Sequence, residues 1–475
     1  MGIVAPLVIG VTSHRNLASR EVEGLRSGVR DFFSKLQRDF PGLPLVVLSP
    51  LAEGGDQLVA REALAAGARL IAPLPMAYQE YVRDFGDAAT RAQFESLSAK
   101  AQVIELPLLP GNTLASIAAY GDARDRQYAQ AGVFTASHCH ILLAIWDGRP
   151  SDALGGTAQI VRFHMDGIPP GLVERRRSRY VSLGTGDESL MYHIVCSRSD
   201  SAEDIQDPMP PFQPMQSRWV TDQGASAGDA GIPREFHHMF LNMQQFNADA
   251  MRDAGDIGAN TPGAHIAATE TLFAVADRLA IHFQKRVLSA MRGLYVLAVL
   301  MGIAFVCYSD LPTGVPYIDD AIYVFVVLFA AGVWLAWLAQ RREWHRKYID
   351  YRALAEGLRV QGYWQRAGIG ADESGAFAHD NFMQKQDVEL GWIRNVMRAA
   401  AVCTAIAPPV CDIAAVVTEW IGEPGGDGQL AYYARKAAQR SRVHHHTQVS
   451  AQALLGIVIS ASVFLALFHP WLDPD

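Results

Sequence analysis

Two long apolar segments separated by a short acidic loop constrain this chain more than any other feature of its sequence. They lie at about residues 291–309 and 321–340, and the second (AIYVFVVLFAAGVWLAWLA) contains no charged side chain. A helix of about 20 apolar residues is long enough to cross the roughly 30 Å hydrocarbon core of a bilayer. The first segment is a little shorter, and Arg292 near its start can reach toward the headgroups. The pair therefore predicts a transmembrane hairpin.

The charges around this hairpin are asymmetric. The loop between the segments carries Asp residues and no Lys or Arg, whereas both outer flanks are basic. Because the cytoplasmic flanks of membrane spans carry the excess of Lys and Arg, both outer flanks are predicted to be cytoplasmic and the loop external. A buried hairpin of a soluble protein, the alternative, needs no such asymmetry. The basic residues are Lys285, Arg286, Arg292, Arg341, Arg342, Arg346 and Lys347.

Composition limits the function classes. The formal net charge of the 475-residue chain is −8 and no basic stripe is present, so nucleic-acid binding is not expected. The five cysteines are scattered without a CxxC pair, which favours a reducing compartment. The N-terminus, MGIVAPLVIGVTSHR, lacks the basic and long apolar regions of a signal peptide. Roughly the first 280 residues are therefore expected to stay in the cytoplasm.

Short apolar runs alternate with helical patterns over residues 1–198. The run CHILLAIW (139–146) is almost continuously apolar, which is typical of a central parallel strand covered on both faces. This alternation predicts an α/β domain with a doubly wound parallel sheet, followed by an all-α transmembrane helical domain. Strands are predicted near 7–11, 45–48, 69–72, 103–106, 139–146 and 193–196, and helices near 20–39, 57–66, 125–137 and 156–166.

Three turns that carry glycine and polar residues each follow a predicted strand. They are GVTSHR (10–15), AEGGD (52–56) and LGGT (154–157), the last one beyond WDG. Ligands of open α/β sheets bind at the carboxyl ends of the strands, where glycine lets backbone N–H groups approach an anion. No catalytic residue and no metal ligand is assigned. The candidate ligand-binding residues are Gly10, Thr12, Ser13, Arg15, Gly54, Gly55, Asp56, Arg124, Arg126, Asp147, Gly155, Gly156 and Thr157.

The glycines, carboxylates and histidines near these turns also have purely structural interpretations. Paired glycines are frequent in ordinary turns, and Asp56 either caps its helix or contacts a ribose hydroxyl. Glu53 and Asp147 are a possible carboxylate pair for general acid–base catalysis, although such groups more often cap turns. His138 and His140 are expected to be hydrogen-bonded residues at the entrance of a strand rather than a metal pair.

Five segments in sequence order resemble the SLOG superfamily, which includes the LOG phosphoribohydrolases, DprA and the N-terminal region of melastatin-type TRP channels. They are GVTSHRNL, SPLAEGGDQLVAREAL with GARLIAPLPM, ARDRQYAQAG, CHILLAIWDG and GGTAQIV, within residues 1–198. The resemblance implies a Rossmann-like fold that binds a nucleotide or nucleotide-derived ligand at the glycine turns. LOG enzymes place a catalytic Glu three residues after the Thr of their Gly-Thr motif. Here that position is Ile160, and the neighbouring Gln159 cannot act as a base, so binding is expected rather than hydrolysis.

The residues between this domain and the hairpin change character twice. Residues 199–260 are predicted to be a loop-rich insertion, with 199–235 rich in Pro, Gly and Ser, and a linker helix near 236–252. A second helix, over 264–288, continues without a breaker into the first membrane segment. We expect it to be a stiff rod through which a ligand signal passes. Beyond the second membrane segment, helix is expected to continue through 341–368.

Residues 261–398 resemble the SLATT family of two-membrane-helix effector domains. The resemblance rests on ADRLAIHFQKR, the hairpin, YRALAEGLRVQGYWQRAGI and ELGWIRNVMR, the last in a helix expected near 381–398. It implies homo-oligomers that perturb or permeate a bacterial inner membrane in antiviral defence. Because the membrane segments hold no internal charge, a poorly selective pore is favoured over a selective ion channel.

Residues 399–475 are predicted to be helical and to contain a third span near 451–471. The basic cluster RKAAQRSRVHHH precedes this span, so the C-terminus is expected to be external. Residues 399–417 are moderately apolar but contain two Pro and an Asp, and are expected to form a packed or interfacial helix. The third span departs from the two-helix SLATT pattern.

The leading hypothesis is a membrane effector with a cytoplasmic nucleotide-sensing domain, whose ligand triggers an oligomeric pore or membrane disruption. The first alternative is a membrane-tethered nucleotide or dinucleotide glycohydrolase that uses Glu53 or Asp147. The second is a scaffold whose ligand crevice is vestigial. The expected partners are the lipid bilayer, a nucleotide-derived second messenger and further copies of this chain.

Overall fold

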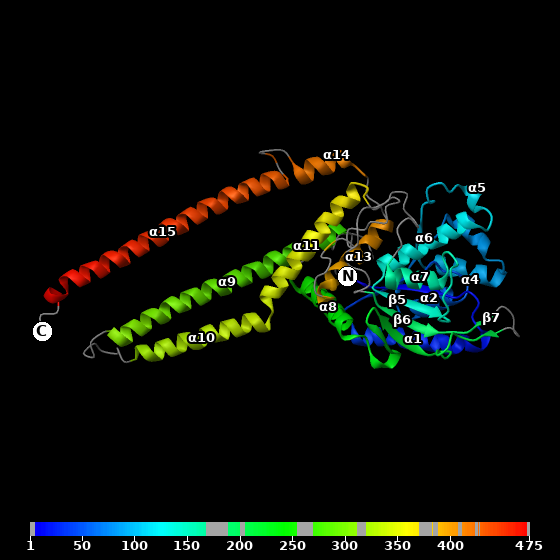
Figure 1. Ribbon diagram of the computed structural model, residues 1–475, viewed down its shortest axis with the longest axis horizontal. Helices are drawn as coiled ribbons and strands as arrows, with labels where there is room; N and C mark the ends of the chain where they lie inside the picture. Colours follow the sequence, from blue (N-terminus) through cyan, green and yellow to red (C-terminus); the bar gives the residue numbers. More distant parts are fainter. Residues whose placement is uncertain are drawn as a thin grey trace. The chain divides into compact units, whose positions relative to one another are not determined.

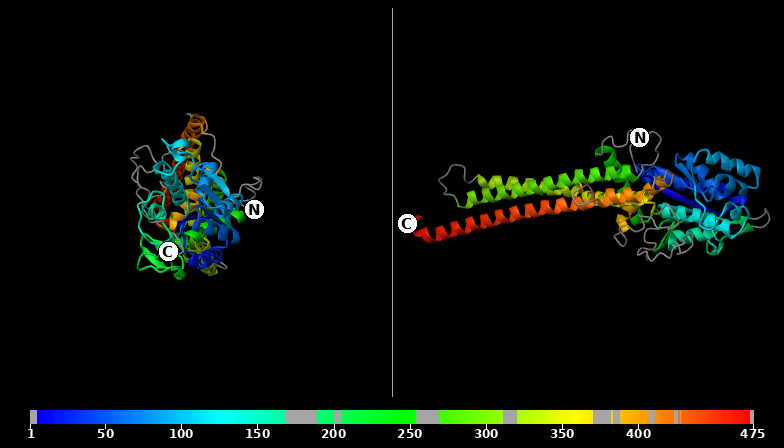
Figure 2. Two further views of the ribbon diagram at one scale, coloured as in Figure 1. Left: turned by 90° about the vertical axis from the view of Figure 1, so that its right-hand side faces the viewer. Right: turned by 90° about the horizontal axis from the view of Figure 1, so that it is seen from above.

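The computed structural model describes residues 5–167, 189–199, 205–253, 269–310, 320–369, 382, 388–406, 411–422, 426 and 428–472. The chain divides into two compact units. The first consists of Met1–Gln365 and Ile369–Pro409, and the second of Arg366–Gly368 and Val410–Asp475. The first unit contains a sheet, the helices around it and the predicted hairpin (Figures 1 and 2).

Eight strands among the described residues form one mixed sheet: β1 (Leu7–Ser13), β2 (Leu45–Leu48), β3 (Arg69–Leu74), β4 (Gln102–Glu105), β5 (Ile141–Trp146), β6 (Met191–Val195), β9 (Ser217–Thr221) and β10 (Gly224–Ala227). Their order is β10-β9-β6-β5-β1-β2-β3-β4. The strands from β6 to β4 are parallel, as the sequence predicts. The winding reverses at β1, between β5 and β2, and ligands of α/β sheets bind at such switch points.

Helices cover both faces of the sheet. They are α1 (Val22–Asp39), α2 (Gly55–Ala65), α3 (Tyr78–Tyr81), α4 (Ala88–Ser98), α5 (Leu114–Ile117), α6 (Asp122–His138) and α7 (Thr157–Asp166). Leu7 and Ile9 of β1 pack in one hydrophobic cluster with α1 and α2, while Val8 packs in another with α6 and α7. This alternation follows from the period of two along a strand. His138 ends α6 rather than entering a strand, because β5 begins only at Ile141.

The antiparallel edge of the sheet corrects the prediction that residues 199–235 form only a loop. Strand β9 pairs with β6, and β10 pairs with β9. Trp219 of β9 is buried, with its ring centroid 4.6 Å from that of Tyr192 and 6.0 Å from that of Phe32. A five-residue strand with one buried aromatic residue gives too short an alternation to be recognised among Pro and Gly residues.

Four helices of the first unit pack together: α8 (Arg234–Asp253), α9 (Thr269–Asp310), α11 (Trp344–Arg366) and α13 (Gly391–Ile406). Tyr351 of α11 lies where they meet. Its ring centroid is 5.7 Å from those of Phe246 and Phe283 and 6.1 Å from that of Trp392. These side chains belong to the same hydrophobic cluster as the α1 face of the sheet, so the helices and the sheet share one core.

Three of the predicted helical segments lie in this bundle. The helix predicted near 236–252 is confirmed as α8. The helix expected near 381–398 begins at Gly391 in α13, and residues 383–387 lie outside the described part of the chain. Ala399, Ala400 and Val402 are buried, which confirms that the start of the 399–417 segment packs against the protein.

The hairpin is built from α9 and α10 (Ala321–Arg341), which lie side by side (Figures 1 and 2). Helix α9 runs unbroken over 42 residues from the bundle into the first apolar segment, as predicted. The expectation of continuous helix through 341–368 is wrong. Helix α10 ends at Arg341, Glu343 has a φ of +51°, and α11 begins at Trp344. The left-handed residue breaks the helix, and α11 beyond it packs in the bundle.

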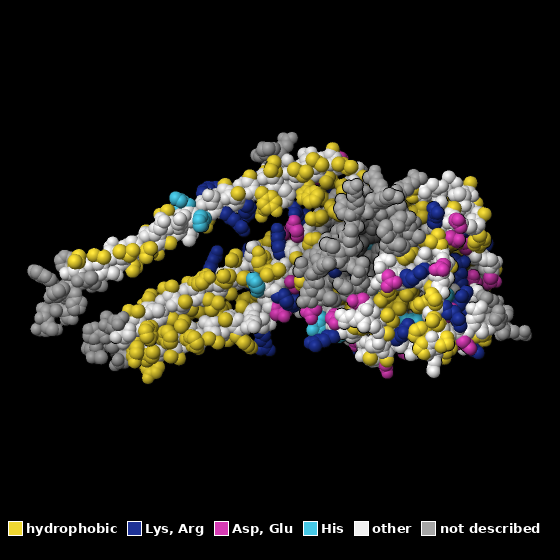
Figure 3. Space-filling view, viewed as in Figure 1, with side chains coloured by type: hydrophobic (Ala, Val, Ile, Leu, Met, Phe, Trp, Pro, Cys, Tyr) yellow, Lys and Arg dark blue, Asp and Glu magenta, His cyan; other side chains and the backbone are white. Residues whose placement is uncertain are grey.

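Within the described residues, three helical stretches are long and apolar enough to cross a membrane: Thr269–Ser309, Ala321–Arg366 and Gln429–Phe464. The most apolar segment of each stretch is almost entirely exposed, and Figure 3 shows hydrophobic side chains gathered over α10. Exposed apolar surface of this extent on long helices indicates a membrane-associated protein. The third stretch belongs to the second unit, where the span predicted near 451–471 lies within α15 (Gln429–Leu472).

Candidate functional site

The three predicted turns converge on Ser13, at the carboxyl end of β1. The Ser13 hydroxyl donates to Asp56 Oδ1 at 2.6 Å, which joins the first turn to the second. Thr157 Oγ1 donates to the Ser13 carbonyl at 2.8 Å, which joins the first turn to the third. The Gly55 N–H donates to the His14 carbonyl at 3.2 Å. Because β1 lies at the switch point, these contacts place the turns where α/β sheets bind ligands.

Two of the turn glycines are required by close approach of the backbone. Gly54 has a φ of +85°, and a Cβ there would lie 2.1 Å from the Arg15 carbonyl oxygen. Gly155 has a φ of +73°, and a Cβ would lie 2.7 Å from the Tyr128 Cβ. Both positions are therefore closed to residues with a side chain. These glycines bring the turns together, whatever they bind.

The other predicted ligand-binding residues of these turns lie within β1 or at the start of α7. Gly10 lies in β1 against α6, where a Cβ would meet the side chains of Cys139 and Thr135 at 2.9 Å. Thr12 is buried in the same strand. Gly156 is the N-cap residue of α7, so the free backbone N–H groups of the first turn of α7 lie beside Ser13.

Asp56 is a buried carboxyl group in the first turn of α2. Gly54 occupies the N-cap position, so Asp56 does not cap this helix in the way that the sequence leaves open. Burial raises the pKa of Asp56 to about 7, against the opposing effects of the Ser13 hydroxyl, the Ala52 N–H and Arg15. Near neutral pH the group therefore exists in both protonation states.

A histidine–carboxylate pair that sequence reasoning missed lies beside these turns. His14 Nε2 is 3.0 Å from Asp147 Oδ1, and the Arg149 N–H donates to the same oxygen at 3.0 Å. Burial alone would raise the pKa of Asp147, but His14 and the Arg149 N–H hold it below the ordinary value. Within the described residues, Asp147 Oδ2 is buried and has no hydrogen-bond partner. The only signal for this pair was the position of His14 within GVTSHR.

The three predicted arginines have different surroundings. Arg15 is exposed, and its guanidinium carbon lies 5.4 Å from the centroid of the Tyr128 ring. Arg124 is buried, donates to Asp84 Oδ1 at 2.5 Å and to the Tyr128 hydroxyl at 3.2 Å, and so holds α6 against the segment after α3. Arg126 is exposed on α6, and nothing in the described part of the chain links it to the turns. Of the three, Arg15 is thus the arginine that lies exposed at the turns.

The carboxylates considered for catalysis have separate partners. Glu53 accepts from Thr90 Oγ1 at 3.3 Å, whereas Asp147 pairs with His14. Ile160, at the position where LOG enzymes carry a catalytic Glu, is buried against Gly132, where a Cβ would lie 2.6 Å from Ile160 Cγ1. Among the described residues, no group of His, Cys, Asp and Glu side chains is placed to hold a metal ion.

A separate cavity of about 390 Å³ lies between α1 and strands β6 and β9. Tyr192, Phe32 and Asp31 are among the residues that line it, and none of the predicted ligand-binding residues does.

No protein-family model matches the chain, and no curated protein sequence matches it significantly. The function is therefore inferred from the geometry of the three turns and of the hairpin.

Proposed function

We propose that this protein is a membrane effector controlled by a nucleotide or nucleotide-derived ligand, which binds at the three turns around Ser13. The observation that carries the proposal is the convergence of two helix N-termini, those of α2 and α7, with exposed Arg15 at the switch point of the sheet. Backbone N–H groups at helix N-termini together with a guanidinium favour phosphate groups. The hairpin belongs to the same compact unit, which gives the ligand a physical route to the membrane.

The proposed ligand contains at least one phosphate group and a polar ring or ribose. The phosphate would lie near Gly55, Gly156 and Arg15. Protonation of Asp56 removes a negative charge that would otherwise repel it. Asp147 Oδ2, which has no hydrogen-bond partner among the described residues, is an acceptor for a ribose hydroxyl or a base N–H.

The same Asp147 supports the second candidate function, a membrane-tethered glycohydrolase. A buried carboxylate beside His14 is an arrangement suited to general acid–base chemistry. The two functions differ in turnover. Release of free base from NAD or nucleoside monophosphates, abolished by Asp147→Asn, is the outcome that this candidate requires.

The test of the leading proposal is thermal stabilisation of the full-length protein in detergent. The ligands are nucleoside mono- and diphosphates, cyclic nucleotides, NAD and ADP-ribose. A ligand at about 100 times its dissociation constant adds about 2.7 kcal/mol of stability, which raises the melting temperature measurably. We expect this rise to disappear in Arg15→Ala and to persist in Arg126→Ala, which removes another exposed arginine that lies outside the turns. A panel without any stabilising ligand would instead support the scaffold alternative.

The proposed orientation in a bacterial inner membrane places the sheet in the cytoplasm and the C-terminus outside. With three spans, the N- and C-termini lie on opposite sides. Alkaline phosphatase fused after residue 475 is expected to be active, because it works only outside the cytoplasm, and a fluorescent protein fused at the same point is expected to be dark. A control fusion after residue 253, before α9, should give the reverse pattern. A fluorescent C-terminal fusion would refute this topology.

A further inference from the structure

Helix α8 holds the amino ends of β1 and β2. The side chain of Asn247 is buried, and its Oδ1 accepts from the Ala5 N–H at 2.8 Å while its Nδ2 donates to the Ala5 carbonyl at 2.9 Å. Nδ2 also donates to the Gly42 carbonyl at 3.0 Å, and Gln244 Oε1 accepts from the Gly42 N–H at 3.1 Å. Ala5 precedes β1, and Gly42 precedes β2. The backbone that leads into the amino ends of β1 and β2, opposite the three turns, is therefore hydrogen-bonded directly to α8.

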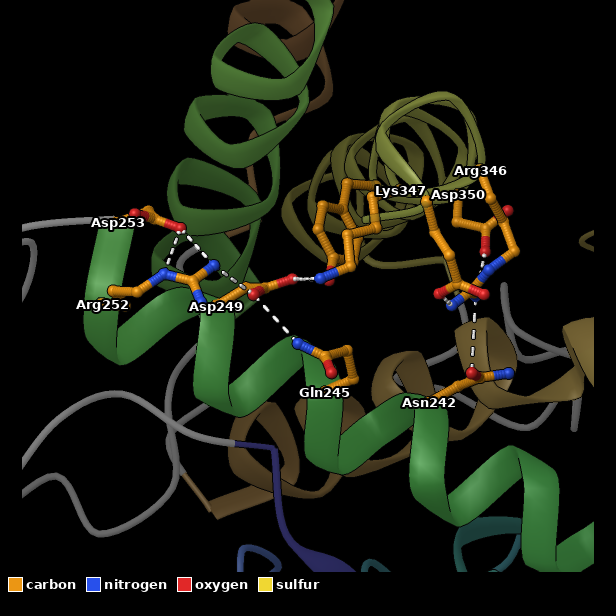
Figure 4. Close-up of polar contacts among 10 residues, drawn as sticks. Asn242, Gln245, Asp249, Arg252, Asp253, Arg346, Lys347 and Asp350 are labelled. Carbon is orange, nitrogen blue, oxygen red and sulfur yellow. Dashed lines mark hydrogen bonds and ion pairs between the residues drawn. The ribbon is translucent and has the colours of Figure 1, made fainter. Parts of the chain in front are cut away.

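Two residues further along α8, Asp249 is bonded to α11. Its side chain is 0% exposed and accepts from four donors, of which Figure 4 labels Gln245, Arg252 and Lys347. The donors are Tyr351 Oη at 2.6 Å, Arg252 Nη2 at 2.7 Å, Lys347 Nζ at 2.8 Å and Gln245 Nε2 at 3.0 Å. Lys347 and Tyr351 belong to α11, and Lys347 Nζ also lies 5.3 Å from the centroid of the Phe283 ring in α9.

A second polar contact joins the same two helices. Arg346 of α11 donates to Asp350 at 3.1 Å, and its Nη1 lies 3.4 Å from Asn242 Oδ1 of α8 (Figure 4). This contact is more exposed than the one around Asp249 and contributes less. Asp249 is different because a fully buried carboxylate is stable only while its partners stay in place. Separation of α8 and α11 there would remove Lys347 and Tyr351 from this buried carboxylate and leave it only Arg252 and Gln245 of its own helix.

We propose that α8 is a joint that couples the position of β1 to that of the membrane hairpin, with Asn247 and Asp249 as its two points of attachment. The inference rests on the proposed function in one respect, namely that the ligand binds at the carboxyl end of β1. Strand β1 carries Ser13 at its carboxyl end, and Ala5 lies just before its amino end. A displacement of β1 reaches α8 through Asn247 and reaches α11, the helix that follows α10, through Asp249. In this scheme α9 receives the displacement at Phe283.

The test is reciprocal hydrogen–deuterium exchange of the full-length protein in lipid nanodiscs, without any ligand. Lys347→Met removes the cation from the α11 side and keeps the apolar stem. It is expected to raise amide exchange by about tenfold or more in residues 5–9 as well as in α11, because breaking a buried ion pair is strongly destabilising. Asn247→Leu cuts the opposite attachment and is expected to raise exchange in residues 344–352. Reciprocity of this kind is what a coupling between two sites requires.

The matched control is Arg352→Gln, which removes an exposed ion pair between α11 and Asp277 of α9 at 2.8 Å. Its effect on residues 5–9 is expected to stay within about twofold, since exposed ion pairs contribute little. If Lys347→Met fails to fold, Tyr351→Phe removes one hydrogen bond to Asp249 and keeps the ring. The proposal is overturned if each substitution raises exchange only on its own side of α8, or if Arg352→Gln has an equal effect. Since no ligand is present, a negative nucleotide screen would leave this result unchanged and would count only against the proposed function.

Discussion

Replacing Gly54 with alanine is expected to destabilise the folded protein by about 2–6 kcal/mol, combining about 1–3 for a strained backbone and about 1–3 for overpacking. Gly54 has a φ of +85° and a ψ of −119°, a combination closed to residues with a Cβ. The new methyl group would lie 2.1 Å from the Arg15 carbonyl oxygen. That oxygen is part of the backbone, so it moves only if the turn after β1 moves away from α2. The measurement is the melting temperature of the full-length protein in detergent.

Gly67 provides the matched control at the other end of the same helix. It follows α2, has a φ of +77°, and a Cβ there would meet nothing within 4 Å. Gly67→Ala therefore carries the conformational cost alone, about 1–2 kcal/mol. The difference in destabilisation between Gly54→Ala and Gly67→Ala therefore measures how much the close approach of the first two turns contributes. Equal destabilisation would show that these turns are not in contact as described, and the proposed crevice would lose its geometry.

Sequence patterns predicted those helices and strands that depend only on residues close together in the chain. The apolar run 139–146 identified β5, and the apolar segment at 321–340 identified α10, because each is long and uninterrupted. The carboxyl-edge position of the three turns followed from strand–helix alternation without any knowledge of contacts. The antiparallel strand β9 was not predicted, because the burial of Trp219 depends on Phe32 and Tyr192, which are distant in sequence.

The parts of the candidate site that depend on long-range pairing could not be predicted. Arg124 looked available for a ligand, yet its partner Asp84 lies 40 residues away, on a segment whose position only the fold defines. The pairing of His14 with Asp147 requires β1 to lie beside β5, and the sequence does not specify the order of strands. The break at Glu343 was also hidden, because helix propensity continues across it and packing of α11 in the bundle overrides that propensity.

Asp56→Asn is expected to make the protein more stable at pH 8 and to remove one component of its pH dependence. Burial raises the folded-state pKa of Asp56 from 3.8 to about 7. A raised pKa means that the folded state binds the proton more tightly than the unfolded state. The contribution of this group is therefore fully present below about pH 4 and is lost as the pH rises toward 7. This interval corresponds to at most about 4 kcal/mol. Asparagine keeps an oxygen that accepts from the Ser13 hydroxyl and cannot ionise.

The measurement compares melting temperatures of the wild type and the variant, as full-length proteins in detergent, between pH 4.5 and pH 8. The difference between them should grow with pH in favour of Asp56→Asn. Asp147→Asn is the control of opposite sign, because the pKa of Asp147 is lowered and its carboxylate stabilises the folded state at neutral pH. That variant should be less stable than the wild type at pH 8, by an amount that shrinks as the pH falls. Parallel profiles for the wild type and Asp56→Asn would mean that Asp56 is ionised throughout, and the crevice would then present a negative charge that opposes a phosphate ligand.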